Sequence, residues 1–414
     1  AQGLLVAMRA QHVARSFFVV ALLLSVAVCK AVADAVRLHQ LSAVEVGHVQ
    51  EAPGSRARGE VPLKLQTLSV NPPIFLIPGF LAENEAESLL QYVKAKKGWI
   101  ASKAGAGEDE ACLRKLTSGK KFALRNFDRD QDGVLKFDEL KLLAQECFQL
   151  VDFEEALLDQ IFEAVGEGKD AGGVPVANAQ LGKGLARFFR KLLKNEPHRL
   201  ERYSRTNWLA YSTPFLQSLR LRAQEVTGWP EALVNQSEEL QAVHYPLKGH
   251  YSCHHDSSPD SIDGGDIRMA TVGMFLNDVP AGGELAFPAA DHSDAAKLTT
   301  RDFEEIEQAC QLPSACINMG GVVVKPRMGD AVLWYTVNLE NLQNLSRRRA
   351  GYGHKVVSWP SLHCGAQVLD GEKWFANLWL RWPTKGWQPS DKPTALNQKL
   401  GSNQGSAESP LASE

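Results

Sequence analysis

The alternation of apolar and polar positions divides this chain of 414 residues into a helical stretch that lies between two stretches typical of β-strands. Around residue 75, the sequence PPIFLIPGFLAENEAESLLQYVKA runs from apolar residues through a glycine into a Glu-rich amphipathic segment. This order predicts a strand followed by a helix. From about Ala101 to His198, apolar residues recur at helical spacing behind charged faces, so the middle of the chain is expected to be helical.

From Leu240 onward the pattern changes to short apolar or alternating runs between Gly and Pro residues. The clearest runs are MATVGMFLND, GGVVVKP, DAVLWYTV and KWFANLWLRW. They predict a β-sandwich or jelly roll, so the chain is expected to be mainly β with helices, in the α+β class. Residues 34–61 are polar with scattered Gly, Pro and Arg and predict a linker, and residues 384–414 have the composition of a disordered tail.

The first 33 residues have the order of a secretory signal. Residues before Met8 look like translated upstream sequence, and Arg9 and Arg15 then precede the apolar run FFVVALLLSVAVC and the small residues AVA. The run is short for a bilayer span, although an uncleaved signal anchor is the alternative. Either interpretation predicts a location in the endoplasmic reticulum lumen or secretory pathway, with a membrane as partner only if the anchor stays. Glycosylation sequons at Asn235 and Asn344 agree with it.

Charge and cysteine content refine this picture. A net charge of −3 with mixed signs gives no basic footprint, so nucleic acid is not expected as a partner. Cys310 and Cys316, in CQLPSAC, are near enough along the chain to predict a short disulfide loop. Cys253 and Cys364 are interpreted as packing residues or as a pair, because the chain has no C-x-x-C spacing for zinc. The pairing of the remaining cysteines and the oligomeric state are left open.

A calcium-binding loop is predicted within the helical stretch. The sequence DRDQDGVLKFDEL, residues 128–140, fits the EF-hand pattern D-x-D-x-D-G-x5-E. The expected calcium ligands are Asp128, Asp130, Asp132, the carbonyl of Val134, and Glu139. Lys136 at the ninth loop position should weaken the site rather than abolish it. The alternative is an acidic surface loop.

EF-hands usually come in pairs, and the partner is expected about forty residues further on. There the sequence FEAVGEGKDAGGVPVANAQL, residues 162–181, has Asp170 but no ladder of acidic residues. It is interpreted as a degenerate partner that binds no calcium. One calcium ion is therefore expected, in an inserted helical module of residues 101–200.

A second metal site is indicated by HYPLKGHYSCHHDSSPD, residues 244–260. On an extended strand, His254 and Asp256 point to one face and His255 to the other. Two imidazoles and one carboxylate with open coordination positions are typical of non-haem Fe(II) oxygenases. The alternative is a polar loop with solvated histidines. The other histidines are expected to be solvated or structural: His244, His250, His255 and His354.

Further motifs follow in order along the chain: GGELAFP, VKPRMGDAVLWY and SLHCGAQVLDGEKWFANLWLRW. Together with the pattern Y-x-x-x-G-x-Y-x-x-H-x-D that runs from Tyr245 to Asp256, they resemble the catalytic domain of prolyl 4-hydroxylases, which are Fe(II)- and 2-oxoglutarate-dependent dioxygenases. The resemblance covers about Pro62 to Trp382. An EF-hand inserted in the oxygenase domain is similar to the transmembrane, endoplasmic-reticulum branch of that family.

The resemblance implies a double-stranded β-helix of jelly-roll type, built from residues 62–100 and 201–383, around the inserted EF-hand pair. It also implies a role for seven residues. Those implied for iron are His254, Asp256 and His363, those implied for 2-oxoglutarate are Lys373 and Tyr245, and those implied for the peptide groove are Tyr251 and Trp379. Aromatic faces suit a proline ring, which has no charge to recognise.

The implied function is hydroxylation of peptidyl proline to 4-hydroxyproline in secretory-pathway proteins, with Fe(II), 2-oxoglutarate, O2 and ascorbate, and with calcium as a modulator. Alternatives are a dioxygenase for another residue or a small molecule, and a catalytically silent, calcium-responsive binding protein. Two positions depart from the family pattern. Leu285 replaces a threonine expected to touch the keto acid, and Cys364 directly follows the distal histidine.

Overall fold

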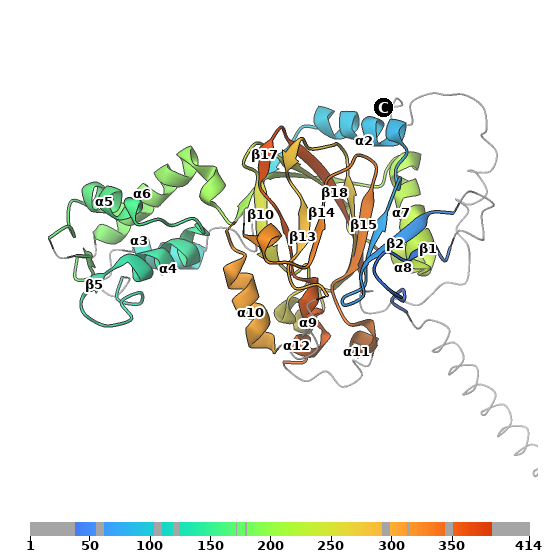
Figure 1. Ribbon diagram of the computed structural model, residues 1–414. Coiled ribbons are helices and arrows are strands. Elements are labelled where there is room, and N and C mark those ends of the chain that lie inside the picture. Colours follow the sequence, from blue (N-terminus) through green and yellow to red (C-terminus); the bar gives the residue numbers. More distant parts are fainter. Residues whose placement is uncertain are drawn as a thin grey trace, which may run out of the picture.

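The computed structural model describes residues 38–54, 62–102, 110–118, 124–170, 172–178, 180–291, 299–312, 315–343 and 351–382 (Figure 1). Two antiparallel β-sheets with covering helices form the larger body, and a helical body lies at its side (Figure 1). The predicted signal segment, the tail and Asn344 lie outside the described residues. Within the described ranges, no helix combines the length and the apolar character needed to cross a membrane.

The large sheet has nine strands. Their order is β1 (Val49–Glu51), β2 (Lys64–Ser69), β3 (Ile74–Ile77), β15 (Ala331–Tyr335), β11 (Arg268–Phe275), β18 (Lys373–Arg381), β9 (Leu240–Tyr245), β8 (Arg205–Leu209) and β4 (Ile100–Ala101). The central strands β11 and β15 are almost continuously apolar because both of their faces are covered. The predicted strand runs of the second half of the chain are thus found in the centre of the fold.

The small sheet has five strands and faces the large one. Their order is β14 (Val322–Val324), β13 (Leu285–Phe287), β16 (His363–Gly365), β10 (His250–His254) and β7 (Arg202–Tyr203). A separate two-stranded ladder joins β12 (Ala281–Gly282) to β17 (Val368–Asp370). Phe275 and Trp334 of the large sheet pack against Phe287 of the small sheet in the apolar layer between them. Complete burial of such a side chain contributes about 1.5–3 kcal/mol.

Helices cover the other face of the large sheet (Figure 1). They are α2 (Glu83–Ala95), α7 (Pro214–Thr227) and α8 (Glu231–Val234). The remaining helical segments of this body are α9 (Pro259–Gly264), α10 (Thr300–Ala309), η3 (Cys316–Asn318), α11 (Leu339–Gln343), α12 (Gly353–Val356) and η5 (Trp359–Ser361). The strand and helix predicted around residue 75 correspond to β3 and α2.

Part of the predicted linker belongs to the fold instead. Strand β1 pairs with β2, and Leu38 and Ala52 are buried in the core beneath the helices. The prediction of a linker is therefore wrong for this part of residues 34–61. The segment is polar because β1 is a three-residue edge strand whose side chains are exposed or half-buried, so its composition resembles that of a loop.

The helical body consists of two helix–loop–helix units. Their helices are α3 (Glu110–Thr117) and α4 (Phe137–Phe148) in the first unit, and α5 (Ala156–Val165) and α6 (Leu181–Asn195) in the second. The short strands β5 (Val134–Leu135) and β6 (Val174–Pro175) pair antiparallel and join the two loops. An apolar core of its own holds this body together, with apolar residues of α6 buried at helical spacing.

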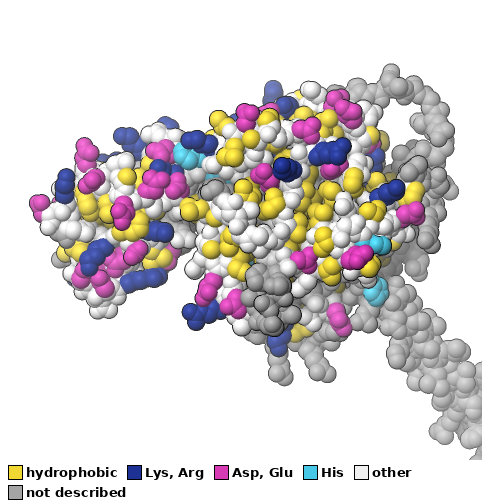
Figure 2. Space-filling view, viewed as in Figure 1, with side chains coloured by type: hydrophobic (Ala, Val, Ile, Leu, Met, Phe, Trp, Pro, Cys, Tyr) yellow, Lys and Arg dark blue, Asp and Glu magenta, His cyan; other side chains and the backbone are white. Residues whose placement is uncertain are grey.

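The helical body is connected to the small sheet at its C-terminal side. Helix α6 leads through η2 (Pro197–Arg199) into β7, which pairs with β10. Leu150, just after α4, forms a β-bridge with Leu200. On the face in Figure 2, acidic and basic side chains are interspersed over both bodies.

Candidate active site

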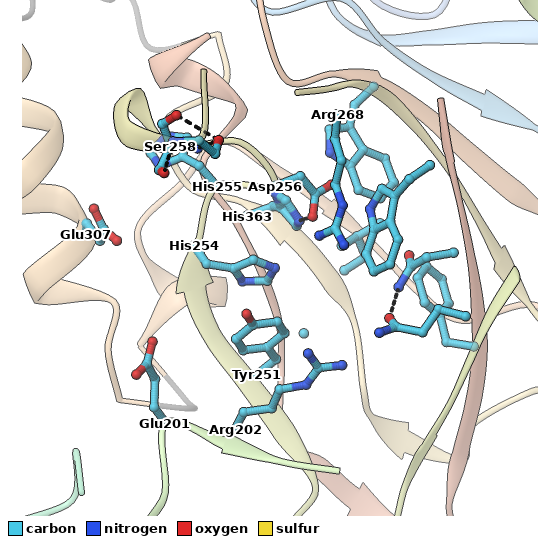
Figure 3. A pocket seen from close by; sticks show the side chains of 18 of the residues that line it. Glu201, Arg202, Tyr251, His254, His255, Asp256, Ser258, Arg268, Glu307 and His363 are labelled. Atoms are coloured by element: carbon cyan, nitrogen blue, oxygen red, sulfur yellow. Dashed lines mark hydrogen bonds and ion pairs between the residues drawn. The ribbon is translucent and has the colours of Figure 1, made fainter. Parts of the chain in front are cut away.

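Two histidines from neighbouring strands of the small sheet face each other at the site. His254 ends β10 and pairs in register with His363, the first residue of β16, and Asp256 follows two residues after His254. One candidate ligand atom from each of the three residues lies within 4.8 Å of the others. The His363 Nε2–Asp256 Oδ1 distance is 3.8 Å, and both side chains are 5% exposed. Figure 3 shows the three side chains directed toward one another.

Each of these donors is fixed by a second partner outside the cluster. The Nδ1 atoms of His254 and His363 each donate a 2.9 Å hydrogen bond to a backbone carbonyl, that of Ser252 and that of Ser361. These bonds leave the Nε2 atoms as the ring nitrogens that can bind a metal. Thr271 Oγ1 donates to Asp256 Oδ2 at 2.6 Å, which leaves Oδ1 for the cluster.

The protonation states of the cluster suit a divalent cation. Burial and the neighbouring His363 hold the pKa of His254 well below its usual range. Burial alone would raise the pKa of Asp256, but the nearby imidazoles, Arg268 and the Thr271 hydrogen bond lower it overall. A neutral imidazole and an ionised carboxylate are the forms that bind metal, and the pKa shifts of His254 and Asp256 favour these forms. The donor set fits Fe(II).

A cavity of about 730 Å³ opens beside the three donors. Lys373, the first residue of β18, reaches into it beside Tyr245, its register partner on β9. The lysine is 2% exposed, and its ammonium forms no ion pair with any residue that the structure describes. Its Nζ lies 5.0 Å from the ring centroid of Phe375 and 5.3 Å from that of Tyr245. A buried ammonium without a carboxylate partner favours an anionic ligand.

Burial shifts the pKa values of both residues at this end of the cavity. Burial lowers the pKa of Lys373 to about 7, against the opposing charge of Glu284. Burial raises the pKa of Tyr245, so its hydroxyl stays protonated and can donate a hydrogen bond. Leu285 on β13 is buried in the same apolar layer and lines the cavity, so no hydroxyl is present at the position where the family has threonine.

The two predicted groove residues lie on opposite walls. A bulge in β10 between Tyr251 and His254 brings both rings to the cavity side, where they stack with centroids 3.6 Å apart. Trp379 lines the other wall, with the Arg268 guanidinium 3.5 Å from its ring centroid. Arg268 also donates two hydrogen bonds, of 2.7 and 2.9 Å, to Glu238.

Several cavity residues were not predicted from the sequence. Arg202, on β7, lies 4.3 Å from the Tyr251 ring, and Glu201 and Glu307 line the side near His254 (Figure 3). Burial raises the pKa of both glutamates, and for Glu307 the nearby Glu201 adds to the effect. Their contributing elements, β7 and α10, lie far apart in the sequence. The only advance signal was that Arg202 opens the block RYSRTNWL, which resembles part of the family pattern.

The other histidines have identifiable partners. Buried His250 lies between the Lys248 and Leu200 carbonyls, and His244 pairs with Glu372 at 2.8 Å. His255 Nε2 is 3.0 Å from the Trp359 carbonyl, and both His255 and His354 line the cavity.

The predicted disulfide pairing is wrong. Cys253 pairs with Cys310, and Cys316 pairs with Cys364, so no loop closes between Cys310 and Cys316. The short sequence spacing was misleading because Cys310 and Cys316 are buried in one cluster with Cys253 and Cys364, and each pairs with one of those strand cysteines. A third disulfide joins Cys112 on α3 to Cys147 on α4.

Residues 240–381 match the 2OG-Fe(II) oxygenase superfamily. This part of the chain is therefore a 2OG-Fe(II) oxygenase domain, and it contains strands of both antiparallel sheets. The family implies Fe(II) and 2-oxoglutarate as cofactors.

Individual relatives are prolyl 4-hydroxylases. Human "Transmembrane prolyl 4-hydroxylase" is 27% identical over 372 residues, which cover 83% of this chain and 69% of that protein. "Probable prolyl 4-hydroxylase 10" of Arabidopsis thaliana is 33% identical over 168 residues, 40% of this chain and 48% of that protein. The solved viral collagen prolyl hydroxylase of Paramecium Bursaria Chlorella virus-1 aligns at 20% identity over 44% of this chain and 80% of its own, with a TM-score of 0.29. The predicted similarity to prolyl 4-hydroxylases is confirmed by the sequence matches.

Proposed function

We propose that this enzyme hydroxylates peptidyl proline to 4-hydroxyproline in proteins of the secretory pathway, with O2 and ascorbate as co-reactants. In this proposal His254, Asp256 and His363 hold iron, and Lys373 and Tyr245 hold the distal carboxylate of 2-oxoglutarate. The observation that carries it is one cavity with a two-histidine, one-carboxylate cluster beside a buried ammonium that forms no ion pair with a described residue. Sequence similarity to proteins named prolyl 4-hydroxylases supports the substrate class.

Iron bound by these residues would supply the oxidation of 2-oxoglutarate and of the substrate C–H bond by dioxygen. The remaining steps belong to the chain's own side chains. The Lys373 ammonium gives the co-substrate carboxylate a charge-assisted hydrogen bond, and the Tyr245 hydroxyl donates a second one. Both residues lie deep in the cavity, so they fix which end of 2-oxoglutarate points toward the metal ligands.

The aromatic walls suit the target residue. Tyr251 and Trp379 line the cavity with aromatic rings, and such a lining suits a proline ring because it requires no charge on the substrate. Arg268 is held over Trp379 by Glu238, so its remaining donors are positioned to meet the carbonyl groups of a bound peptide.

The test uses the purified full chain with Fe(II), 2-oxoglutarate, ascorbate and proline-containing peptides. We expect succinate release that depends on the peptide, and a peptide mass increase of one oxygen atom located on proline. His363→Ala serves as the control that should abolish both signals. Hydroxylation of another residue would support the alternative substrate class, and no turnover despite normal metal binding would support the silent-binder alternative.

We further propose that residues 101–200 are an EF-hand pair in which the loop from Asp128 to Glu139 binds one calcium ion. Carboxylate oxygens of Asp128, Asp130 and Glu139 cluster within 4.8 Å. Asp128 Oδ1 is buried without a hydrogen-bond partner, which is a polar atom that a cation would satisfy. Gly133 has φ +92°, as the sharp turn of such a loop requires. These observations support a calcium ion in preference to an acidic surface loop.

A continuous hydrogen-bonded path supports modulation of the oxygenase by calcium. Glu139 lies in the first turn of α4, and the helix ends at the Gln149 carbonyl, which accepts a 2.8 Å bond from the Glu201 amide. The Glu201 carbonyl accepts a 2.9 Å bond from the Ser252 amide, and the Ser252 carbonyl accepts the bond from His254 Nδ1. A displacement of α4 would therefore reach a proposed iron ligand.

The secretory location rests on two features besides the signal-like segment. The described residues contain three disulfides, which persist in oxidising compartments. Asn235 of the first sequon is exposed, as glycosylation requires.

A further inference from the structure

Each of the two histidines of the cluster has a cysteine as its chain neighbour. Cys253 precedes His254 on β10, and Cys364 follows His363 on β16. Since successive side chains of a strand point to opposite faces, these cysteines lie behind the cavity wall. They are buried there in a small apolar cluster on the outer face of the small sheet.

Both cysteines are bonded to one short segment. Cys253 is bonded to Cys310, which caps α10, and Cys364 is bonded to Cys316, which begins η3. The Ser252 hydroxyl adds a 2.6 Å hydrogen bond to the Gln311 carbonyl of the same segment. We call the two disulfides Cys253–Cys310 and Cys316–Cys364 the clamp. The clamp therefore ties both histidine-bearing strands to two cysteines that are only six positions apart in the sequence.

We propose that the clamp positions His254 and His363 and thereby sets the affinity of the enzyme for iron. This inference rests on the proposed function, because it takes these histidines as the iron ligands. The clamp cysteines act through the histidines and touch no substrate, so they are positioning residues.

The physical reason is that cysteine and histidine share a peptide unit. Fixing the Cα of Cys253 and of Cys364 limits how far the neighbouring histidines can separate when no metal draws them together. The strands alone give weak restraint here, because the bulge before His254 interrupts the β10–β16 ladder. A pair of ligands held in place before binding loses less conformational freedom when the ion arrives, so affinity rises.

A general stabilising role is the competing explanation, and the chain offers a matched control. The Cys112–Cys147 disulfide joins two helices of the other body and lies next to no residue of the cluster. Its removal changes overall stability by the same chemistry and removes no cross-link to β10 or β16. The comparison is between two clamp variants, C253A/C310A and C316A/C364A, and the control variant C112A/C147A.

The experiment titrates each full-length variant anaerobically with Fe(II), and with Mn(II) as a redox-inert probe, by calorimetry. The visible charge-transfer band of the Fe(II)–2-oxoglutarate complex gives a second readout that does not depend on turnover. Either clamp variant should bind metal about 10- to 100-fold more weakly, as for residues that orient metal ligands. Activity at saturating iron should return toward the wild-type kcat, while the iron concentration at half-maximal activity rises in parallel.

Wild-type metal affinity in a folded clamp variant would overturn the inference, whatever happens to its melting temperature. An equal loss of affinity in the control variant would overturn it too, because the effect would then not depend on the clamp. Should one clamp variant fail to fold, the other decides, since each frees one histidine. Failure of the wild-type chain to bind metal would overturn the proposed function itself, and that result differs from equal binding by all four proteins.

Discussion

The two clusters that are proposed to bind a metal ion differ in how their donor groups are held. The cluster of His254, Asp256 and His363 is assembled from separate strands, is largely buried, and has each donor held by a further partner. The loop cluster around Asp128 is contiguous in sequence and partly exposed, since Asp130 and Asp132 are exposed whereas Glu139 is buried. There the chain's own Lys136 forms ion pairs with Asp130 and Asp132.

This difference predicts different behaviour toward metal. The first cluster is prepared for an ion, so binding requires little rearrangement. The second cluster must release an ammonium before all of its carboxylates can turn to calcium. Substitutions in each cluster test this difference in readiness for a metal ion, and they follow in order of decreasing expected effect.

The largest effect is expected from Asp256→Asn. It removes the only anionic donor of the buried cluster, so Fe(II) affinity and activity should fall by more than about a hundredfold, beyond the range for indirect partners. Thr271→Val removes only the hydrogen bond that orients Asp256 and should cost about tenfold. Metal titration by calorimetry measures both. Calcium binding should stay unchanged in both variants, and a parallel loss there would indicate unfolding.

The next effect concerns Lys373→Met, which keeps much of the volume and removes the charge. The KM for 2-oxoglutarate should rise about 10- to 100-fold, the size of a hydrogen bond to a charged group. Initial-rate kinetics measure it. An unchanged KM would show that this ammonium does not hold the co-substrate. Lys94→Met, at an exposed lysine paired with Glu372, is the matched control.

The pKa of Lys373 predicts two opposite trends with pH. Only the ammonium binds a carboxylate, so affinity of the free enzyme for 2-oxoglutarate should fall as pH rises through about 7. In the folded state the pKa of Lys373 is lowered from 10.5 to about 7, so between these two pH values the unfolded chain binds more protons than the folded chain. The free energy of unfolding therefore increases as the pH rises through this range. Lys373→Met should remove this lysine's contribution to both pH dependences. Co-substrate titration across pH measures the first, and chemical denaturation across pH measures the second.

The comparison also explains what could be predicted from the sequence. The proposed calcium loop needs only twelve consecutive residues, so its spacing carries most of its geometry. His254 and His363 are separated by 109 positions in the sequence. Only the order of the family motifs predicted that the two side chains would lie close together. The strands and the central helices followed from their apolar periodicity.

Features that depend on the packing of separate elements were not predictable. The clamp requires that α10 and η3 lie across the outer face of β10 and β16, which no local pattern encodes. Arg268, Glu238 and Trp379 come from different parts of the chain and meet only because β11 pairs with β18. Leu38 and Ala52 are buried by contacts with distant elements, so their polar surroundings concealed them.

A smaller effect is expected for the coupling between the clusters. Arg199 joins η2 to the segment after α4 through Asp152, at 3.1 Å, and to Glu196, at 2.6 Å. We expect Mn(II) with a non-reacting 2-oxoglutarate analogue to change calcium affinity about fivefold, the lower end of common coupling energies. Arg199→Gln should abolish this change while leaving calcium affinity itself near the wild-type value. Calcium affinity that ignores the occupancy of the other cluster would exclude the coupling and leave a structural ion.

The smallest effect concerns Lys136, and it tests the contrast most directly. If the ammonium competes with calcium for Asp130 and Asp132, Lys136→Gln should raise calcium affinity about two- to fivefold, the size of an exposed ion-pair contribution. Lys141→Gln, at an exposed position of α4, changes the net charge equally and controls for long-range electrostatics. Calorimetry at two salt concentrations separates direct competition by Lys136 from the general effect of net charge. Salt screens both contributions, whereas only Lys136 also has to leave its carboxylates before calcium can bind them. Equal gains in the two variants would mean that the lysine acts only through net charge and that the loop is as ready for its ion as the buried cluster.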